Sequence, residues 1–281
     1  MDIVIQAALV GLLQGLTEFI PISSSAHLEL APWIAGWDSD GLIGSLAFDV
    51  FLHLGTLVAL LVYFARDWVR YVGAGLGSLR ERRIGDDPDR RIAWLLIGAT
   101  IPAAVIGFAL EGFIEDAFHG DNDGARLAIA GFLVVGALAL WLADRLGSQR
   151  RGLADLTAPT ALTIGLSQAL ALFPGISRSG ATITAGRALG LSRDAAARFS
   201  FLLATPITLG AGLYGSGRLL TETHTGTEWL AIGVGFAVAV LSGLIAIGFL
   251  LAWLRRRSLA VFSAYRVIFA AIIVLLVVIG R

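Results

Sequence analysis

The sequence reads PISSSAH at residues 21–27 and PGISRSG at residues 174–180, and both stretches lie inside apolar sequence. Ile22-Ser23 and Ile176-Ser177 are 154 positions apart. Proline interrupts a helix, and nearby serine hydroxyls can satisfy the backbone groups that the interruption frees where water is scarce. Two such breaks at matching points of two half-chains predict paired discontinuous helices around a site near the middle of the membrane.

The composition indicates the class of protein. Of 281 residues, 57% are hydrophobic and 15% are charged, and the mean hydropathy is +0.81. Soluble domains carry about 25% charged residues, so we expect an all-α polytopic membrane protein. The formal net charge of zero argues against a nucleic-acid partner. The absence of cysteine excludes disulfides and thiolate metal sites.

Apolar stretches of about 20 residues, long enough to cross a bilayer, predict six transmembrane helices. Two further apolar segments, 3–35 and 158–190, are interrupted by proline, serine and charge, and we interpret them as re-entrant helix pairs. The six predicted spans are 43–65, 92–111, 127–143, 196–217, 229–254 and 260–280.

Loop charge predicts how these spans are oriented. Loops 66–91, 144–155 and 255–257 are rich in arginine and are expected in the cytoplasm. Loops 112–126 and 218–228 carry an excess of acidic residues and are expected outside. All six spans satisfy this pattern if the first re-entrant segment enters from outside and the second from the cytoplasm.

The two halves then have opposite orientations. We expect a single membrane domain, residues 1–281, made of two inverted-topology repeats, residues 1–150 and 151–281, with both termini outside. The sequences FDVFL at 48–52 and FSFLL at 199–203, which are 151 positions apart, agree with this division.

Gln14 and Glu18 have i,i+4 spacing, which places them on one helix face. Gly11 and Gly15 share that spacing and would let another helix approach closely. An ionised carboxylate is costly inside a bilayer, so Glu18 should face a polar cavity or a partner. A carboxylate that only pairs with a buried arginine is the alternative that the residues leave open.

After the first proline, Ser23 or Ser24 is expected to cap a short helix that runs through Leu30. His27 lies three residues after Ser24, so the two can share a helix face, and histidine is the usual base for a serine nucleophile. Serines that only satisfy the backbone of a broken helix are the alternative.

Arg178 is the most informative residue of the second break. Its guanidinium is always charged and presents a fork that suits phosphate oxygens. A Pro-Gly turn that leads into a helix is a natural anion site, and hydroxyl groups of Ser177, Ser179 and Thr182 lie nearby in sequence. These residues predict a phosphate cradle, although Arg178 could also pair structurally with Glu18.

Asp49 and His53 have i,i+4 spacing in the first predicted span. We expect them to border the same cavity.

At these residues the chain resembles the undecaprenyl-diphosphate phosphatase family, bacterial membrane enzymes associated with bacitracin resistance. The family signature is a Glu/Gln-x-x-x-Glu motif followed by P-x-S-S-x-x-H, and a second motif, P-G-x-S-R-S-x-x-T. This chain has QGLTEFIPISSSAH at 14–27 and PGISRSGAT at 174–182. The flanking sequences FDVFLHLGT and FSFLLATP also look like the family, so the resemblance covers nearly the whole chain.

The resemblance implies hydrolysis of undecaprenyl diphosphate to the monophosphate and inorganic phosphate, which recycles the lipid carrier of cell-wall peptidoglycan synthesis. It also implies a bacterial plasma (inner) membrane location, a site facing the external or periplasmic side, and a divalent cation, Mg²⁺ or Ca²⁺. The partners are then a long-chain prenyl diphosphate lipid and the bilayer. A homodimer with a second copy of the chain is kept as a partner hypothesis.

The resemblance also implies roles for individual residues. Glu18 would be the essential acidic residue, with Gln14 as its partner on the cation. Many family members have Glu at the position of Gln14, so any account that needs two carboxylates on the metal is in doubt for this chain. Ser24 would be the nucleophile, His27 an acid/base and Arg178 the phosphate clamp. The expected substrate contacts are Gln14, Ser23, Ser25, Ser177, Ser179 and Thr182.

Two other classes of function remain open at this point. Inverted repeats with broken helices are typical of secondary transporters, so transport or flipping of a phosphate-bearing lipid is the alternative. An intramembrane serine protease is disfavoured, because the chain has no G-x-S-x-G elbow and an arginine beside the serine suits phosphate better than peptide.

Overall fold

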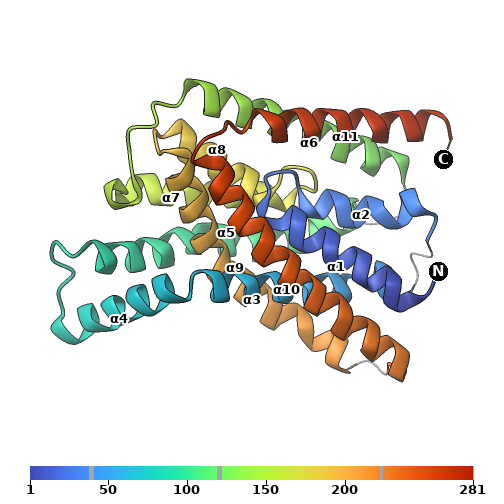
Figure 1. Ribbon diagram of the computed structural model, residues 1–281, viewed down its shortest axis with the longest axis horizontal. Coiled ribbons are helices and arrows are strands. Elements are labelled where there is room, and N and C mark those ends of the chain that lie inside the picture. The colour runs from blue at the N-terminus through green and yellow to red at the C-terminus, as the bar shows by residue number, and fades with distance from the viewer. Residues whose placement is uncertain (38–40, 119–121, 222–223, 281) are drawn as a thin grey trace.

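The computed structural model describes residues 1–37, 41–118, 122–221 and 224–280. These residues form helices joined by short turns (Figure 1). The α-helices are α1 (Ile3–Phe19), α2 (Ser24–Ala35), α3 (Leu46–Tyr63), α4 (Ala65–Glu81), α5 (Pro88–Phe118), α6 (Asp123–Leu146), α7 (Ala158–Ser167), α8 (Arg178–Ala188), α9 (Arg193–Thr221), α10 (Gly226–Leu254) and α11 (Ala260–Val278). Short 3₁₀ turns are η1 (Leu42–Gly44), η2 (Leu153–Asp155) and η3 (Gln168–Leu172).

The long apolar helices confirm an all-α polytopic membrane protein. Among the described residues, five segments are long and apolar enough to cross a bilayer: Pro88–Leu110, Asp123–Leu146, Arg193–Leu213, Gly226–Leu254 and Ala260–Val278. The pair α3 and α4 supplies a sixth if it counts as one bent span. This upper count equals the six predicted spans. The helices α1 and α7–η3 are apolar but shorter, as expected for segments that enter and return.

The structure corrects the prediction of a loop at 66–91, because α4 occupies most of it. This helix turns by 80° from the end of α3. Tyr71 and Ser78 are buried, and the indole nitrogen of Trp94 on α5 donates to the Ser78 hydroxyl at 2.8 Å. The apolar positions along the rest of α4 recur at helical spacing and are exposed: Val69, Val72, Leu76 and Leu79. That spacing, interleaved with arginine, is the sequence signal of an amphipathic helix.

Helix α1 packs closely against α10 through its glycines, as predicted. A Cβ on Gly11 would lie 2.2 Å from the carbonyl oxygen of Gly235, and one on Gly15 would lie 1.9 Å from the hydroxyl of Ser242. No real side chain fits at those distances, so glycine is required where the two backbones meet. This contact fixes the helix that carries Gln14 and Glu18.

The two breaks have the same local geometry. Ser23 caps α2 with φ 76°, and Ser177 caps α8 with φ 71°. Non-glycine residues seldom adopt this left-handed backbone, and such strain persists only where surrounding structure imposes it. The two turns also meet, because the backbone N–H of Gly175 donates to the Ser23 hydroxyl at 3.1 Å.

Helix α2, the second helix of the first re-entrant segment, is longer than predicted. It continues past Leu30 to Ala35 with Pro32 inside it, and it ends at Gly36, whose φ is 65°. A proline removes one backbone hydrogen bond, which this helix tolerates; the left-handed glycine provides the actual stop.

Helix α11 braces both breaks through two consecutive residues. The Tyr265 hydroxyl lies 2.7 Å from Nε2 of His27, on the first break. Arg266 is fully buried and donates to the carbonyl oxygens of Gly175 at 2.7 Å and Ile176 at 3.0 Å, on the second. A buried guanidinium thus satisfies carbonyl groups that the interrupted helix leaves free.

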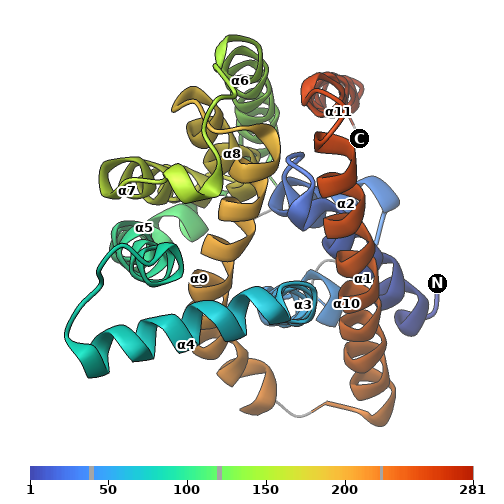
Figure 2. The same cartoon turned by 60° about the vertical axis from the view of Figure 1, so that its left-hand side comes forward.

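Two pairs of helices pack closely together. Helices α6 and α11 run side by side along one edge, and α1 lies against α10 (Figures 1 and 2). Both termini lie at one end, and the α4–α5 and α6–α7 connections lie at the opposite end (Figure 1). This grouping agrees with the arginine-rich loops sharing one side.

Candidate active site

The breaks open onto a cavity of about 530 Å³. One part of its wall is mainly polar and comes from the two breaks and α3; it carries Glu18, Ser24, Ser25, His53, Ser177 and Arg178. The remainder comes from α5, η3 and α9 and is mainly apolar, with Thr100, Gln168 and Thr208 as its polar residues. A polar head region that continues into an apolar groove suits a ligand that is charged at one end and hydrocarbon at the other.

Glu18 is the centre of the polar region. Its side chain is 4% exposed, and its Oε2 accepts hydrogen bonds from the Ser24 hydroxyl at 2.6 Å and from Nε2 of Gln14 at 3.1 Å. Nε2 of His53 lies 3.5 Å from the same oxygen. The other oxygen, Oε1, pairs with Nη2 of Arg178. The predicted shared face of Gln14 and Glu18 and the cavity position of His53 are therefore confirmed. Asp49, which was expected beside His53, is not among the residues that line this cavity.

Arg178 is held at both ends of its guanidinium fork. Nη1 donates to the hydroxyl of Thr208 at 2.8 Å and to the carbonyl oxygen of Ala204 at 3.1 Å, both on α9. Nη2 makes the ion pair with Glu18, so the structural pairing considered from sequence is present. The side chain still lines the cavity and is 17% exposed. An arginine fixed in this way is preorganised for an anion in the cavity.

The hydroxyl groups divide into two sets. Ser24, Ser25 and Ser177 line the cavity. Ser23 and Ser179 bond to Ser25 and Ser177 respectively, each at 3.2 Å. These contacts, repeated in both breaks, are internal to the turns.

Thr182 lies deeper in the protein than the sequence suggested. It is fully buried, and its hydroxyl lies 2.6 Å from that of Ser200 on α9 and donates to the Arg178 carbonyl at 2.8 Å. Its position supports the helix that begins with Arg178.

The structure corrects the predicted pairing of His27 with Ser24. Nδ1 of His27 lies 2.7 Å from the carbonyl oxygen of Ser23, and Nε2 lies 2.7 Å from the Tyr265 hydroxyl. The ring also stacks on Phe269 at 4.4 Å between centroids. Both nitrogens are therefore engaged away from Ser24, whose hydroxyl bonds to Glu18 instead. Three-residue spacing allows a shared face but does not determine the rotamer.

Several residues of the site were not found from sequence. Thr208 and Ala204, which anchor Arg178, carry no local signal, because they lie 30 and 26 positions further along the chain, on another helix. Arg266 did carry a signal that was missed: an arginine inside a predicted apolar span needs an internal partner. Tyr265 could have been identified only once the position of the His27 ring was known, because its contact in the site is with that ring.

The oxygen ligands near Glu18 suit a divalent cation only if the substrate supplies further ligands to it. Within the described parts of the chain, no three His, Cys, Asp or Glu side chains are grouped closely enough to hold a metal ion by themselves. Oε1 of Gln14 is buried, however, and no described residue hydrogen-bonds to it. An unused oxygen ligand next to a carboxylate suits a hard cation, which commonly takes its other ligands from water and phosphate.

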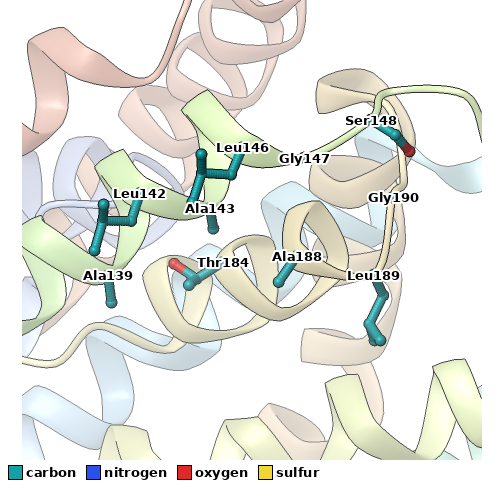
Figure 3. A pocket seen from close by; sticks show the side chains of 10 residues that line it. All are labelled: Ala139, Leu142, Ala143, Leu146, Gly147, Ser148, Thr184, Ala188, Leu189 and Gly190. Carbon is teal, nitrogen blue, oxygen red and sulfur yellow. The ribbon is translucent and has the colours of Figure 1, made fainter.

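A second hollow of about 650 Å³ lies between the C-terminal end of α6 and α8. Figure 3 shows Leu142, Ala143 and Leu146 on α6 facing Thr184 and Ala188 on α8. Its lining carries no titratable side chain, so it offers nothing for phosphate chemistry. The smaller cavity at the breaks is the candidate active site.

Known proteins resemble this chain over nearly its whole length. The chain matches the family described as bacitracin resistance protein BacA over residues 7–272. It is 45% identical over 271 residues to an undecaprenyl-diphosphatase of Moorella thermoacetica, covering 96% of this chain and 97% of that protein. Proteins of the same name from Pelobacter propionicus and Desulforudis audaxviator are each 44% identical, over 98% of both chains for the former and 96% and 97% for the latter.

Proposed function

The chain belongs to the bacitracin resistance protein BacA family, and on that premise we propose that it hydrolyses undecaprenyl diphosphate to undecaprenyl phosphate and inorganic phosphate. The observation that carries the proposal is the 2.6 Å hydrogen bond from the Ser24 hydroxyl to Glu18, beside Arg178, at the mouth of an apolar groove. A serine activated by a carboxylate is a nucleophile, and the arginine suits the phosphate that it would attack.

In the first step, Oγ of Ser24 attacks the terminal phosphorus and Oε2 of Glu18 takes the hydroxyl proton. The bond from that phosphorus to the bridging oxygen breaks, which releases undecaprenyl phosphate and leaves a phosphoserine. Glu18 then passes that proton to the departing undecaprenyl phosphate, which returns the side chain to a carboxylate. In the second step, water attacks the phosphoserine and gives a proton to Oε2 of Glu18, the bond from phosphorus to Oγ breaks, and Glu18 returns the proton to Oγ. Inorganic phosphate leaves and the Ser24 hydroxyl is restored.

The charge of the phosphate is met by preorganised groups. Ser24 is the first residue of α2 and Arg178 is the first residue of α8, so both helix N-termini lie at the cavity. Free N–H groups and the helix dipole favour an anion there. Arg178 is already fixed by Thr208, so it need not reorganise as charge develops on the phosphate. His27 acts in this account as a positioning residue that holds the first break.

The apolar wall accommodates the prenyl chain. It is built largely of small residues, including Ala103, Ala104 and Gly107 on α5 and Gly210 on α9. Phe108 on the same wall is 80% exposed, which places the groove at the surface that lipid would cover. A prenyl chain can therefore remain in hydrocarbon while its diphosphate enters the polar region.

A divalent cation, Mg²⁺ or Ca²⁺, would be held by Glu18 and the free carbonyl oxygen of Gln14 together with substrate oxygens. When bound, it would neutralise phosphate charge beside the nucleophile. The proposed location is the bacterial inner membrane with the site open to the external side, as the family resemblance implies. The arginine-rich loops predict which ends of the spans face the cytoplasm.

Release of inorganic phosphate from a long-chain prenyl diphosphate by detergent-purified protein tests this function. Hydrolysis needs no second compartment, whereas transport does. We expect phosphate release by the wild type, a loss with chelator and recovery with Mg²⁺ or Ca²⁺. Accumulation of substrate in sealed vesicles without phosphate release would instead indicate the transporter alternative.

A further inference from the structure

Gln168 is an unexplained buried polar group on the cavity wall. It is 4% exposed and lines the cavity. Both its amide nitrogen and its amide oxygen are shielded from solvent, and neither has a hydrogen-bond partner among the residues that the structure describes. Buried side-chain amides are nearly always hydrogen-bonded, because an unmatched one loses its interactions with water and gains nothing in return. An amide in this state at a binding cavity points to a ligand.

Comparison of the two breaks explains why this amide is free. Gln14 and Gln168 are 154 positions apart, the same offset that relates Ser23 to Ser177. The amide of Gln14 donates to Glu18, four residues further along its helix. The position four residues after Gln168 is Leu172, which also lines the cavity but whose side chain cannot accept a hydrogen bond. The second glutamine therefore has the same place in its repeat as the first, but it lines the cavity without a carboxylate partner.

Helix packing fixes Gln168 on the apolar side of the cavity. A Cβ on Gly165 would lie 2.0 Å from the carbonyl oxygen of Ala99, so α7 is pressed against α5 one turn before Gln168. Gln168 begins η3, whose other cavity-lining residues are Ala169, Ala171 and Leu172. It is thus a single amide on the wall where the polar head region gives way to the groove.

We propose that Gln168 binds the lipid-proximal phosphate of the prenyl diphosphate by donating its amide N–H to a phosphoryl oxygen. This inference rests on the proposed function. Arg178 and Ser24 hold the terminal phosphate, so the phosphate between it and the hydrocarbon chain falls at the boundary that Gln168 occupies. A neutral donor there stabilises phosphate charge without adding a buried charge. Because the proximal phosphate stays on the lipid, Gln168 also binds the prenyl monophosphate product.

The decisive variant is Gln168→Met, which has a similar shape and no hydrogen-bonding group. Steady-state hydrolysis gives kcat and KM, and inhibition by a prenyl monophosphate gives its Ki. We expect KM and Ki to rise together by about 10-fold or more, because the charged phosphate of the substrate and of the product each loses a hydrogen bond. We expect kcat to change by less than about 3-fold. Gln6→Met, the same substitution near the start of α1, should leave all three constants unchanged.

A second variant and a stability measurement keep the test decisive. Gln168→Glu places a negative charge against phosphate and should weaken monophosphate binding more than Gln168→Met does. The thermal midpoint of Gln168→Met in detergent should equal or exceed that of the wild type, because an unmatched buried amide has been removed. An unchanged Ki, or a rise in KM without a rise in Ki, overturns the proposal.

Direct binding separates this inference from the proposed function. If the wild type releases no phosphate, the function fails. Calorimetric titration of wild type and Gln168→Met with prenyl monophosphate then still tests Gln168. Weaker binding by the variant supports the contact, and equal binding refutes it.

Discussion

Replacing Glu18 by glutamine tests the assignment of the base in this site. The substitution keeps the shape of the side chain and its ability to accept one hydrogen bond. It removes the charge that pairs with Arg178 and the group that accepts the Ser24 proton. Because general base catalysis contributes about 10²–10⁴-fold, we expect kcat to fall by roughly that factor.

The same change should cost stability by an amount that the structure bounds. Breaking a fully buried ion pair costs about 3–5 kcal/mol. The Arg178 side chain is 17% exposed and remains bonded to Thr208 and Ala204, so we expect a smaller cost of about 2 kcal/mol. Thermal unfolding in detergent should then show a midpoint lower by a few degrees, which leaves the protein folded at assay temperature.

Two further variants separate chemistry from folding. Glu18→Asp keeps the carboxylate but shortens it, so its turnover should lie between those of the wild type and Glu18→Gln. Glu81→Gln removes an exposed carboxylate paired with Arg90 and should leave turnover unchanged, since surface ion pairs contribute little. A folded Glu18→Gln protein with kcat within about 3-fold of the wild type would refute the role of this carboxylate as base.

Three other predictions address the clamp, the packing and the topology. Arg178→Lys keeps the charge but cannot reach Thr208 and the carboxylate together, so we expect turnover to fall by about 100-fold, and normal turnover would show that any cation suffices. Gly11→Val should destabilise the protein by about 1–3 kcal/mol or more in thermal unfolding, because its side chain would meet the α10 backbone; an unchanged midpoint would contradict the close packing. Single cysteines at Asp86 and Thr227, both exposed, should be labelled by an impermeant thiol reagent in inside-out and right-side-out vesicles respectively, and the reverse pattern would overturn the predicted orientation.

Local spacing predicted those features of the site that lie within one helix. The i,i+4 relation of Gln14 to Glu18 needs only an α-helix, and the structure confirms it. Gly11 and Gly15 predicted close packing for the same reason. The matching breaks were also readable, because proline and serine have strong and specific effects on an apolar helix.

Contacts between distant segments could not be read in this way. His27 is held by Tyr265, 238 positions along the chain, so its spacing from Ser24 was misleading. Arg178 depends on Thr208 of another helix. Helix α4 was missed because its arginines suggested a loop, although its apolar residues recur at helical spacing. The inverted-topology division into residues 1–150 and 151–281 stays a prediction.

The stereochemistry of phosphate release tests the central claim, that Ser24 attacks phosphorus directly. The substrate would be a prenyl diphosphate whose terminal phosphorus is a thiophosphate made chiral with oxygen isotopes, hydrolysed in isotopically labelled water. Two successive in-line displacements, first by Ser24 and then by water, predict released thiophosphate with retained configuration. Inverted configuration would mean a single attack by water and would contradict the account.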